Sequence, residues 1–588
     1  MEIFLQFTEI ILKGFLSSIF IISCGYILSK LFSNHDKEDL AETGLLGFVL
    51  IGMLAVILNF FTPLSKSINN LILIFPIISL ILILKKNKLK ELKIKKFIFF
   101  NLKVAFMSLI LIAYSKINMP DGAWYHLPYT KILNDHKIIF GITTLQSVFG
   151  VTSIFQYISA FFNNSFFNDR GIILPTALCL SFFIIFFISK FKNNKNFLLK
   201  IFSFFICSYI FLQINRYGKI GNDYLGYLYL MYLIYTFFSY KRFYNYDNFF
   251  KKILLTSFFC LTNKLLLVFT LLIPAYILIK KIKSIVFFNV KSFVILIFVF
   301  SWILKNIIIS GCLFYPIKIT CNENLAWYSN KENFYIAANN FATFSELHNK
   351  QWNSINSYKS YNENKEYQQY VENFNWFNNW IQKKGYLSIF KIIDTFILYL
   401  IILFFVFFIT HEKNYLNLKI RKIFFTFKIQ FLFYFSLISF IMLFYKLPVG
   451  RYLFGYLILI IFCLISPLFY KFKKKSDQIL KLFLILSFVT FVSKNVFRIT
   501  SEITLENNNI VWPKIYNFTN KLSDEPINFS SIKKNSFNIY FSNSSNYWFA
   551  QKKLCGYNTS PCAPNNHSFD QFVINKKLSY KIFNLNKN

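Results

Sequence analysis

A single aspartate opens the first polar segment that is long enough to hold a reactive site. Asp121 follows an apolar stretch, in the sequence Asp-Gly-Ala-Trp-Tyr-His-Leu-Pro. An asparagine and a proline just before it favour a helix start, so Trp124 and Tyr125 would share a helix face with the carboxylate. A carboxylate backed by aromatic rings at a water–lipid boundary could take a proton from a substrate hydroxyl. The alternative is an acid favoured by the helix dipole, with the aromatic residues as membrane-interface anchors.

A second acid follows a later outward turn of the chain. Asp223 ends the sequence Asn-Arg-Tyr-Gly-Lys-Ile-Gly-Asn-Asp, at the start of a predicted span. With Asp121 it could serve as a partner for a metal or a substrate hydroxyl, which leaves a divalent metal open as a cofactor. The alternative is that Asp223 is an ordinary helix-start residue. His126 lies off the predicted face of Asp121, so it is either part of a substrate site or an interfacial histidine.

Several cations lie on the side of the membrane that basic residues usually avoid. Some lie at span ends, where long side chains can reach the interface. Cations beside a lipid-facing cavity are also what a phosphate or pyrophosphate headgroup requires. Lys264 and Arg451 are the strongest candidates for this role, whereas Lys219 and Lys446 are expected to be solvated. The complete predicted substrate-binding set is Tyr125, His126, Arg216, Asp223, Lys264, Lys305, Arg451 and Tyr452.

Sequence motifs for nucleotide chemistry are missing from the chain. It contains no glycine-rich phosphate loop, no His-Glu-x-x-His and no Gly-x-Ser-x-Gly. The predicted cytosolic loops are short, so a nucleotide-sugar domain would have no place on that side. A reaction on the outer face would therefore take its donor from the membrane itself.

The elements that must position these residues are membrane helices. The 588-residue chain is 55% hydrophobic and 15% charged, whereas an ordinary soluble chain carries about 25% charged residues. This composition excludes intrinsic disorder, a disulfide mini-protein and a nucleic-acid-binding module as descriptions of the whole chain. We attribute the net charge of +38 to short topogenic loops. Long apolar runs cover residues 3–31, 71–84, 389–409 and 452–469.

Six basic clusters set the predicted topology of the chain. The positive-inside rule places all six in the cytoplasm, so an even number of spans must separate neighbouring clusters. Between Lys252 and Lys280 this parity requires two short helices with a reversal at Thr262–Lys264. The basic clusters lie within 85–96, 190–200, 241–252, 280–291, 411–428 and 471–481.

The expected fold is an all-α polytopic protein of about 12–14 membrane helices with both termini outside. Within the first outer loop, the amphipathic stretch 145–167 is expected to lie along the membrane interface. The outer tail is expected to form a small α/β or irregular domain. The predicted order is membrane helices in 1–116, a first outer loop with interfacial helices in 117–170, a membrane core in 171–309, a second outer loop in 310–387, C-terminal membrane helices in 388–496 and the outer tail in 497–588.

Four cysteines fall in the outer segments, where an oxidising compartment permits disulfides. Cys555 and Cys562 bracket a short, turn-rich sequence and are the favoured pair. Cys312 with Cys321 is the second candidate pair. The outer cysteines do not indicate a metal site, because no histidine lies at ligand spacing.

Four short motifs, taken in order, resemble a known superfamily. They are Asp121–Pro128, then Trp302–Asn306 continuing through Gly311 to Pro316, then Pro448–Tyr452, and finally Cys555 with Pro561–Pro564. This arrangement resembles the GT-C superfamily of membrane glycosyltransferases. More narrowly, it is similar to an uncharacterised bacterial family of large, multispanning GT-C-like proteins. The resemblance covers most of the chain, about residues 100–565.

The resemblance implies a function and a location. GT-C enzymes take a sugar from a polyprenyl-phosphate or polyprenyl-pyrophosphate carrier and transfer it with inversion. The first-loop aspartate activates the acceptor, so Asp121 would have that catalytic role, and Asp223 matches a later acid by position. The acceptor would be an extracytoplasmic glycan, lipid or protein, and the chain would lie in the plasma (inner) membrane, without nucleic acid as a partner. The alternatives are a transporter or flippase, or an O-antigen polymerase or ligase, for a lipid-linked saccharide.

Overall fold

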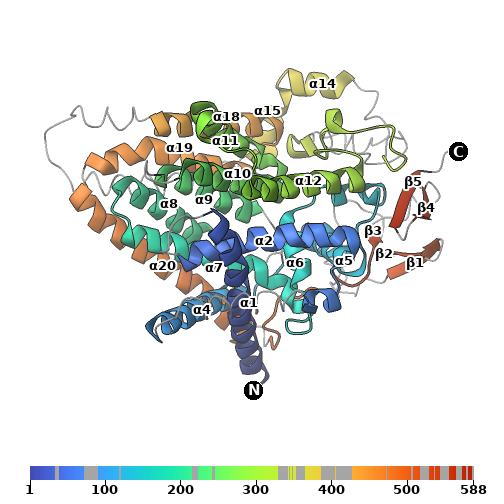
Figure 1. Cartoon of the computed structure of the whole chain (residues 1–588), viewed down its shortest axis with the longest axis horizontal. Helices are drawn as coiled ribbons and strands as arrows, with labels where there is room; N and C mark the ends of the chain where they lie inside the picture. The colour runs from blue at the N-terminus through green and yellow to red at the C-terminus, as the bar shows by residue number, and fades with distance from the viewer. Residues whose placement is uncertain are drawn as a thin grey trace.

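Helices dominate the structure, which is a computed structural model (Figure 1). Two small sheets lie at one end of the helical bundle. The structure describes residues 1–32, 39–71, 91–117, 121–214, 223–240, 245–328, 365–385, 427–471, 473–504 and 508–516, with shorter pieces between 342 and 351 and between 529 and 585, and residues 397, 401 and 404.

Among these described residues, eight helical segments are long and apolar enough to cross a membrane. This number and the helical content indicate an all-α polytopic membrane protein. The apolar runs 71–84 and 389–409 lie mostly outside the described residues, so the predicted total of spans stays untested. The eight segments belong to α1 (Glu2–Phe32), α2 (Leu40–Phe61), η4 with α7 (Asp169–Ile173, Leu174–Asn193), η5 with α11 and η6 (Leu265–Leu271, Leu272–Lys281, Ile282–Ser284), α12 (Val290–Ser310), α18 (Phe427–Lys446), α19 (Gly450–Lys471) and α20 (Lys473–Thr504).

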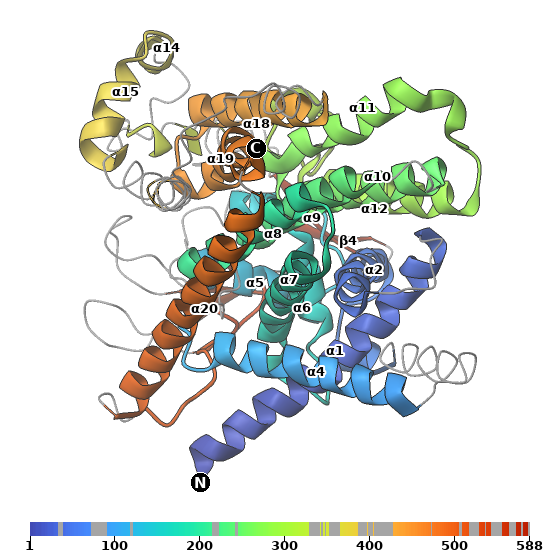
Figure 2. The same cartoon turned by 90° about the vertical axis from the view of Figure 1, so that its left-hand side faces the viewer.

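Four further helices complete the described part of the bundle. Two of them are short for a span, and the other two carry more polar residues. Figure 2 shows α1 and α4 crossing on one side of the bundle, with α10, α11, α12, α18 and α19 grouped on the other. The four helices are α4 (Glu91–Ile112), α8 (Phe197–Gln213), α9 (Asp223–Ser239) and α10 (Tyr246–Asn263).

Close packing of α1 on α2 depends on two glycines. A Cβ atom on Gly25 would lie 1.8 Å from the carbonyl oxygen of Thr43, and one on Gly47 would lie 2.0 Å from that of Ile21. The two backbones therefore touch directly. Small residues at such crossings are typical of membrane helix pairs, which associate through close packing.

Basic residues from separate loops meet at one end of the bundle. Lys190, in the last turn of α7, lies 2.8 Å from Asp39, the N-cap of α2. Lys252, in the first turns of α10, lies 2.5 Å from Glu42 in the first turn of α2. These two contacts place the basic clusters 190–200 and 241–252 side by side. Such proximity is expected if both clusters face the same side of the membrane.

The predicted reversal at Thr262–Lys264 is confirmed. Helix α10 ends at Asn263, Lys264 has an extended backbone, and η5 begins at Leu265. The chain then returns through α11. Lys264 therefore lies at the tip of a helical hairpin.

The first outer loop folds into short helices inside the protein. They are η1 (Gly122–His126), α5 (Leu127–Asp135), η2 (Ile142–Thr144), η3 (Ser147–Gly150) and α6 (Ile154–Phe161). Residues 145–167 were expected to lie along the membrane interface, but α6 in the middle of this stretch is buried at every residue. Helix α6 packs between α2 and α5, so protein covers the apolar face that lipid was expected to cover.

The second outer loop contributes short helices to the same end. They are η7 (Lys318–Thr320), α14 (Lys365–Glu372), α15 (Asn375–Trp380) and η9 (Ile381–Gly385). Near its start, Cys312 and Cys321 form a disulfide.

The outer tail begins later than expected, because α20 continues to Thr504. Its described secondary structure consists of strands. Strands β1 (Phe529–Lys534) and β2 (Phe537–Ser542) are antiparallel, with Phe529 opposite Ser542, and the short β3 (Cys562–Ala563) runs parallel to β2. Strands β4 (Phe572–Lys577) and β5 (Tyr580–Leu585) form a separate antiparallel hairpin.

The tail is attached to the first outer loop by several contacts. The backbone N–H of Phe140 donates to the carbonyl of Lys581 at 3.0 Å. Cys555 and Cys562 form a disulfide in the same region. Loop and tail therefore form one layer at the end of the bundle opposite the basic clusters.

The arrangement predicts which positions a membrane-impermeant maleimide reaches in intact cells. The other five cysteines are buried, so the background labelling should be low. Ser165→Cys, at an exposed position of the first outer loop, should react, whereas Lys195→Cys, exposed in a basic loop, should react only after permeabilisation. The opposite labelling pattern would reverse the predicted orientation.

Candidate functional site

Asp121 stands at the entrance of an unusually wide helical turn. The next five residues, Gly122–His126, form a π-helix in which the N–H of Leu127 donates to the carbonyl of Gly122. An α-helical first turn was expected here. Single π turns of this kind occur frequently at functional sites.

Arg451 meets Asp121 from the other end of the chain. Its Nη1 lies 2.9 Å from Oδ2 of Asp121, although 330 residues separate the two. Arg451 belongs to the first turn of α19. The Asp121 side chain is 23% exposed and the Arg451 side chain 42%, so water reaches the pair.

Tyr452 brings a second cation to the same place. Lys264 Nζ lies 3.8 Å from the centre of its ring, and the Arg451 guanidinium carbon lies 5.0 Å from that centre. The Tyr452 hydroxyl also accepts a hydrogen bond from Nη2 of Arg451 at 3.0 Å. One aromatic ring therefore holds both predicted headgroup-binding cations through cation–π contacts.

A neighbouring helix fixes the backbone of Tyr452. The hydroxyl of Tyr227, on α9, donates to the Tyr452 carbonyl. The Tyr227 ring fits because residue 455 is a glycine, since a Cβ there would lie 2.0 Å from the ring. Helices α9 and α19 thus lock the turn that carries Arg451.

A polar relay links the Asp121 turn to the Lys264 turn through the start of α6. Gln156 Nε2 lies 3.1 Å from Nδ1 of His126. The other atom of this amide, Oε1, accepts from the Ser153 N–H at 2.8 Å, so Nε2 is the donor and Nδ1 of His126 the acceptor. Ser153 Oγ then lies 2.7 Å from Oδ1 of Asn263, the residue before Lys264. We call Asp121, His126, Lys264, Arg451 and Tyr452 the Asp121 cluster.

Lys305 does not reach this cluster's surface. Its side chain is completely buried. Its Nζ donates to Oγ1 of Thr152 and lies 3.6 Å from the centre of the Trp302 ring. The expectation that Lys305 contacts substrate is therefore not met, because Trp302 and the start of α6 cover its ammonium group.

Of the three other predicted residues, the structure describes the side chain of only one. Tyr125 lies beside His126, with 4.1 Å between the ring centres and a tilted arrangement of the rings, and is partly buried. Asp223 is the first residue of α9, but its side chain lies outside the described part of the structure. Arg216 also lies outside the described residues. Within the described residues, no three His, Cys, Asp or Glu side chains gather as a metal site would require.

A tryptophan of the second outer loop donates a hydrogen bond to the turn that carries Arg451. Trp380 Nε1 donates to the carbonyl of Pro448, three residues before Arg451, at 2.8 Å. Lys446 lies close by but is 62% exposed and reaches Glu346 at 3.3 Å. Lys446 is therefore a solvated cation, in line with expectation.

Several residues of this region were not anticipated from the sequence. Ser153 and Gln156 form a capping box, and the pattern Ser-x-x-Gln is a recognisable helix-start signal. Tyr227 and Asn263 carry no comparable local signal, because their partners lie on other helices. Their roles emerge only from the packing of α9 and α10.

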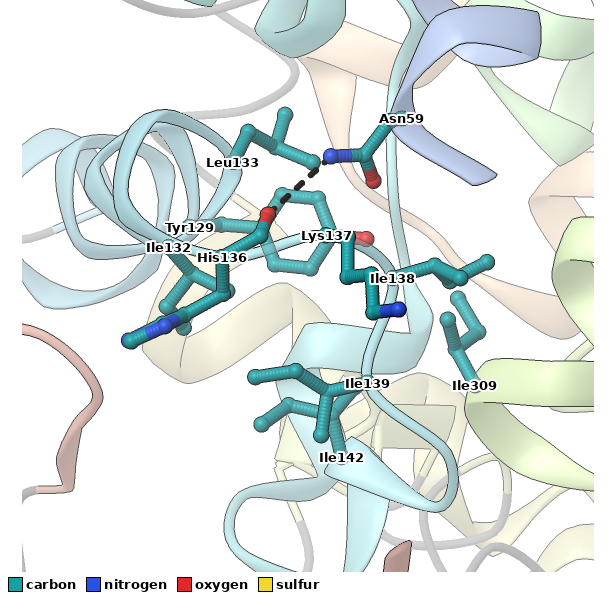
Figure 3. Close-up of a pocket in the computed structure, with 10 residues that line it drawn as sticks. All are labelled: Asn59, Tyr129, Ile132, Leu133, His136, Lys137, Ile138, Ile139, Ile142 and Ile309. Carbon is teal, nitrogen blue, oxygen red and sulfur yellow. Dashed lines mark hydrogen bonds between the residues drawn. The ribbon is translucent and has the colours of Figure 1, made fainter. Parts of the chain in front are cut away.

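A small pocket lies on the tail side of the first outer loop (Figure 3). Asn59 donates to the carbonyl of His136 at 3.1 Å across its wall. Its volume of about 10 Å³ is about one water molecule, so it is not a substrate site. Burial and the ammonium of Lys581, 3.2 Å from Nδ1, lower the pKa of His136 to about 4.

This lowered pKa predicts that acid weakens the attachment of the tail. The ordinary histidine pKa is about 6.5, so folding favours the neutral ring, and stability falls as pH drops from about 6.5 to 4. The loss should reach at most roughly 3 kcal/mol. Thermal midpoints between pH 7 and 4 should fall less steeply in His136→Gln and in Lys581→Gln, which removes the ammonium. Parallel curves for all three proteins would contradict this origin.

Comparison with known proteins adds one match. No curated protein and no solved structure matches the chain. A family model described as a domain of unknown function, DUF8201, matches residues 9–458. This range contains every residue of the Asp121 cluster and stops before the tail. The chain therefore belongs to the DUF8201 family.

Proposed function

We propose that the protein is a membrane glycosyltransferase that moves a sugar from a polyprenyl-phosphate-linked donor to an extracytoplasmic glycan, lipid or protein. The observation that carries the proposal is the 2.9 Å contact between Asp121 and Arg451, with Lys264 stacked on the adjacent Tyr452. A carboxylate and two cations from distant segments meet there at a partly exposed end of the bundle. The plasma (inner) membrane and its extracytoplasmic face are the proposed location.

The chemistry assigns separate tasks to the acid and the cations. The acceptor hydroxyl oxygen forms a bond to the anomeric carbon while the bond from that carbon to the donor phosphate oxygen breaks. The hydroxyl proton passes to the Asp121 carboxylate. The leaving phosphate keeps the bonding electrons, and the guanidinium of Arg451 and the ammonium of Lys264 stabilise its added charge. The hydroxyl attacks the face of the sugar opposite the leaving phosphate, so the configuration at the anomeric carbon is inverted.

The ion pair also suggests an order of binding. Oδ2 of Asp121 accepts a hydrogen bond from Nη1 of Arg451. A phosphate offers more negative charge and a matching geometry for the guanidinium. Donor binding would draw Arg451 from the carboxylate and leave Asp121 free to act as a base. The donor would therefore bind before the acceptor.

The surroundings of Lys264 suit a lipid-borne donor. Val268 in η5 and Leu272 in α11, which follow Lys264 as the chain returns, are exposed. Ile441 and Met442 on the neighbouring α18 are exposed as well. An isoprenoid chain could lie against these apolar side chains while its phosphate reaches the cations.

The central prediction concerns Asp121→Asn, which keeps the size of the side chain but cannot accept a proton. Transfer from a radiolabelled polyprenyl-phosphate sugar to an envelope fraction should fall at least about 100-fold, near the lower end of general-base contributions. Binding of farnesyl phosphate should become tighter, because Arg451 no longer pairs with an anion. Near-normal transfer would remove Asp121 as the base, whereas a wild-type protein that transfers no sugar would favour the transporter or flippase alternative. Polymerase or ligase activity would differ in its product, which would carry a whole saccharide chain.

The cations predict a separate effect on donor affinity. Lys264→Gln and Arg451→Gln should each weaken farnesyl phosphate binding in nanodiscs by about 10-fold or more, because each removes a charged contact to phosphate. Lys446→Gln is the matched control, since this cation lies beside the turn but pairs with Glu346. Inorganic phosphate as a competitor distinguishes a lipid headgroup site from a free-phosphate site. Equal affinity in all three variants would remove both cations from the site.

A further inference from the structure

Pro128 leaves one carbonyl in the Asp121 turn without a donor from its own helix. In the π turn, the N–H of Leu127 is used by the carbonyl of Gly122. The carbonyl of Ala123 would next pair with residue 128, which is a proline and has no N–H. Ala123 is completely buried, and a buried carbonyl requires a partner.

The missing donor comes from the outer tail. The backbone N–H of Gly556 donates to the carbonyl of Ala123 at 2.8 Å. Gly556 adopts a φ of +59°, a left-handed conformation that glycine reaches without strain. It lies within the loop that the Cys555–Cys562 disulfide closes. A segment more than 400 residues away in the sequence thus completes the turn that Asp121 opens.

Tyr557 holds this loop against the first outer loop. It is completely buried. Its hydroxyl accepts from Nδ2 of Asn163 at 2.7 Å and donates to Oδ1 of Asn134 at 2.6 Å. Its backbone N–H donates to the carbonyl of Ile515 at 3.1 Å. The residue after Gly556 is therefore fixed on three sides.

We propose that the Cys555–Cys562 loop is a clamp that sets the geometry of the Asp121 turn, with Tyr557 as its positioning residue. The clamp acts through the Gly556–Ala123 hydrogen bond and touches no substrate. Its place in the fold is independent of the reaction. Its effect on the rate of sugar transfer rests on the proposed function.

Hydrogen exchange tests the clamp without any substrate. Tyr557→Phe removes both hydrogen bonds of the hydroxyl. It should raise exchange in residues 121–130 by about 10-fold or more, because the lost hydrogen bonds make local opening of the turn easier. Tyr580→Phe is the matched control, because that tail hydroxyl donates to the carbonyl of Phe60 at 2.9 Å, away from Asp121. It should leave exchange in 121–130 unchanged. If Tyr557→Phe does not fold, the Cys555→Ser, Cys562→Ser double variant replaces it.

Kinetics then separates positioning from binding. Tyr557→Phe should lower the transfer rate at saturating donor, while its affinity for farnesyl phosphate stays that of the wild type. Unchanged exchange in 121–130 in a folded variant would overturn the clamp. Raised exchange in a chain whose wild type transfers no sugar would uphold the clamp and reject the proposed function.

Discussion

The contact between Asp121 and Arg451 joins two parts of the chain that are 330 residues apart. It fixes the first outer loop against the start of α19, which Tyr227 and Trp380 hold from two further elements. Both side chains are partly exposed, and such pairs contribute only about 0–1 kcal/mol to stability. The contact therefore costs little to break. The packing of α9, α15 and α19 determines where these two charges meet.

The polar groups of the Asp121 cluster lie at the ends of helices, because the middle of each membrane helix is surrounded by apolar side chains and lipid. A charge inside the bilayer is costly, whereas a helix terminus lies at the water boundary. Lys305, outside the cluster, lies within α12, where aromatic faces and a threonine hydroxyl cover its ammonium. The relay from His126 through Gln156 to Asn263 connects two loop tips in the same layer. One layer thus holds the Asp121 cluster and the residues that link its members.

Local patterns predicted the helical elements and several cluster members. Apolar run lengths indicated the spans, and charge parity located the reversal at Lys264. The π turn was not predictable, because it depends on Pro128 together with a donor from residue 556. The burial of α6 was missed because periodicity reports an apolar face but does not identify what covers it. The Asp121–Arg451 contact required the packing of helices that are distant in sequence.

The direction of synthesis gives the tail contact a further meaning. Chains fold from the N-terminus as they emerge, so Asp121 and its partners are in place well before Gly556 is made. The carbonyl of Ala123 must wait for a donor that lies near the end of the chain. The nascent protein therefore holds an incomplete Asp121 turn throughout insertion. This turn can reach its final geometry only after the last segment of the chain has been made and has docked.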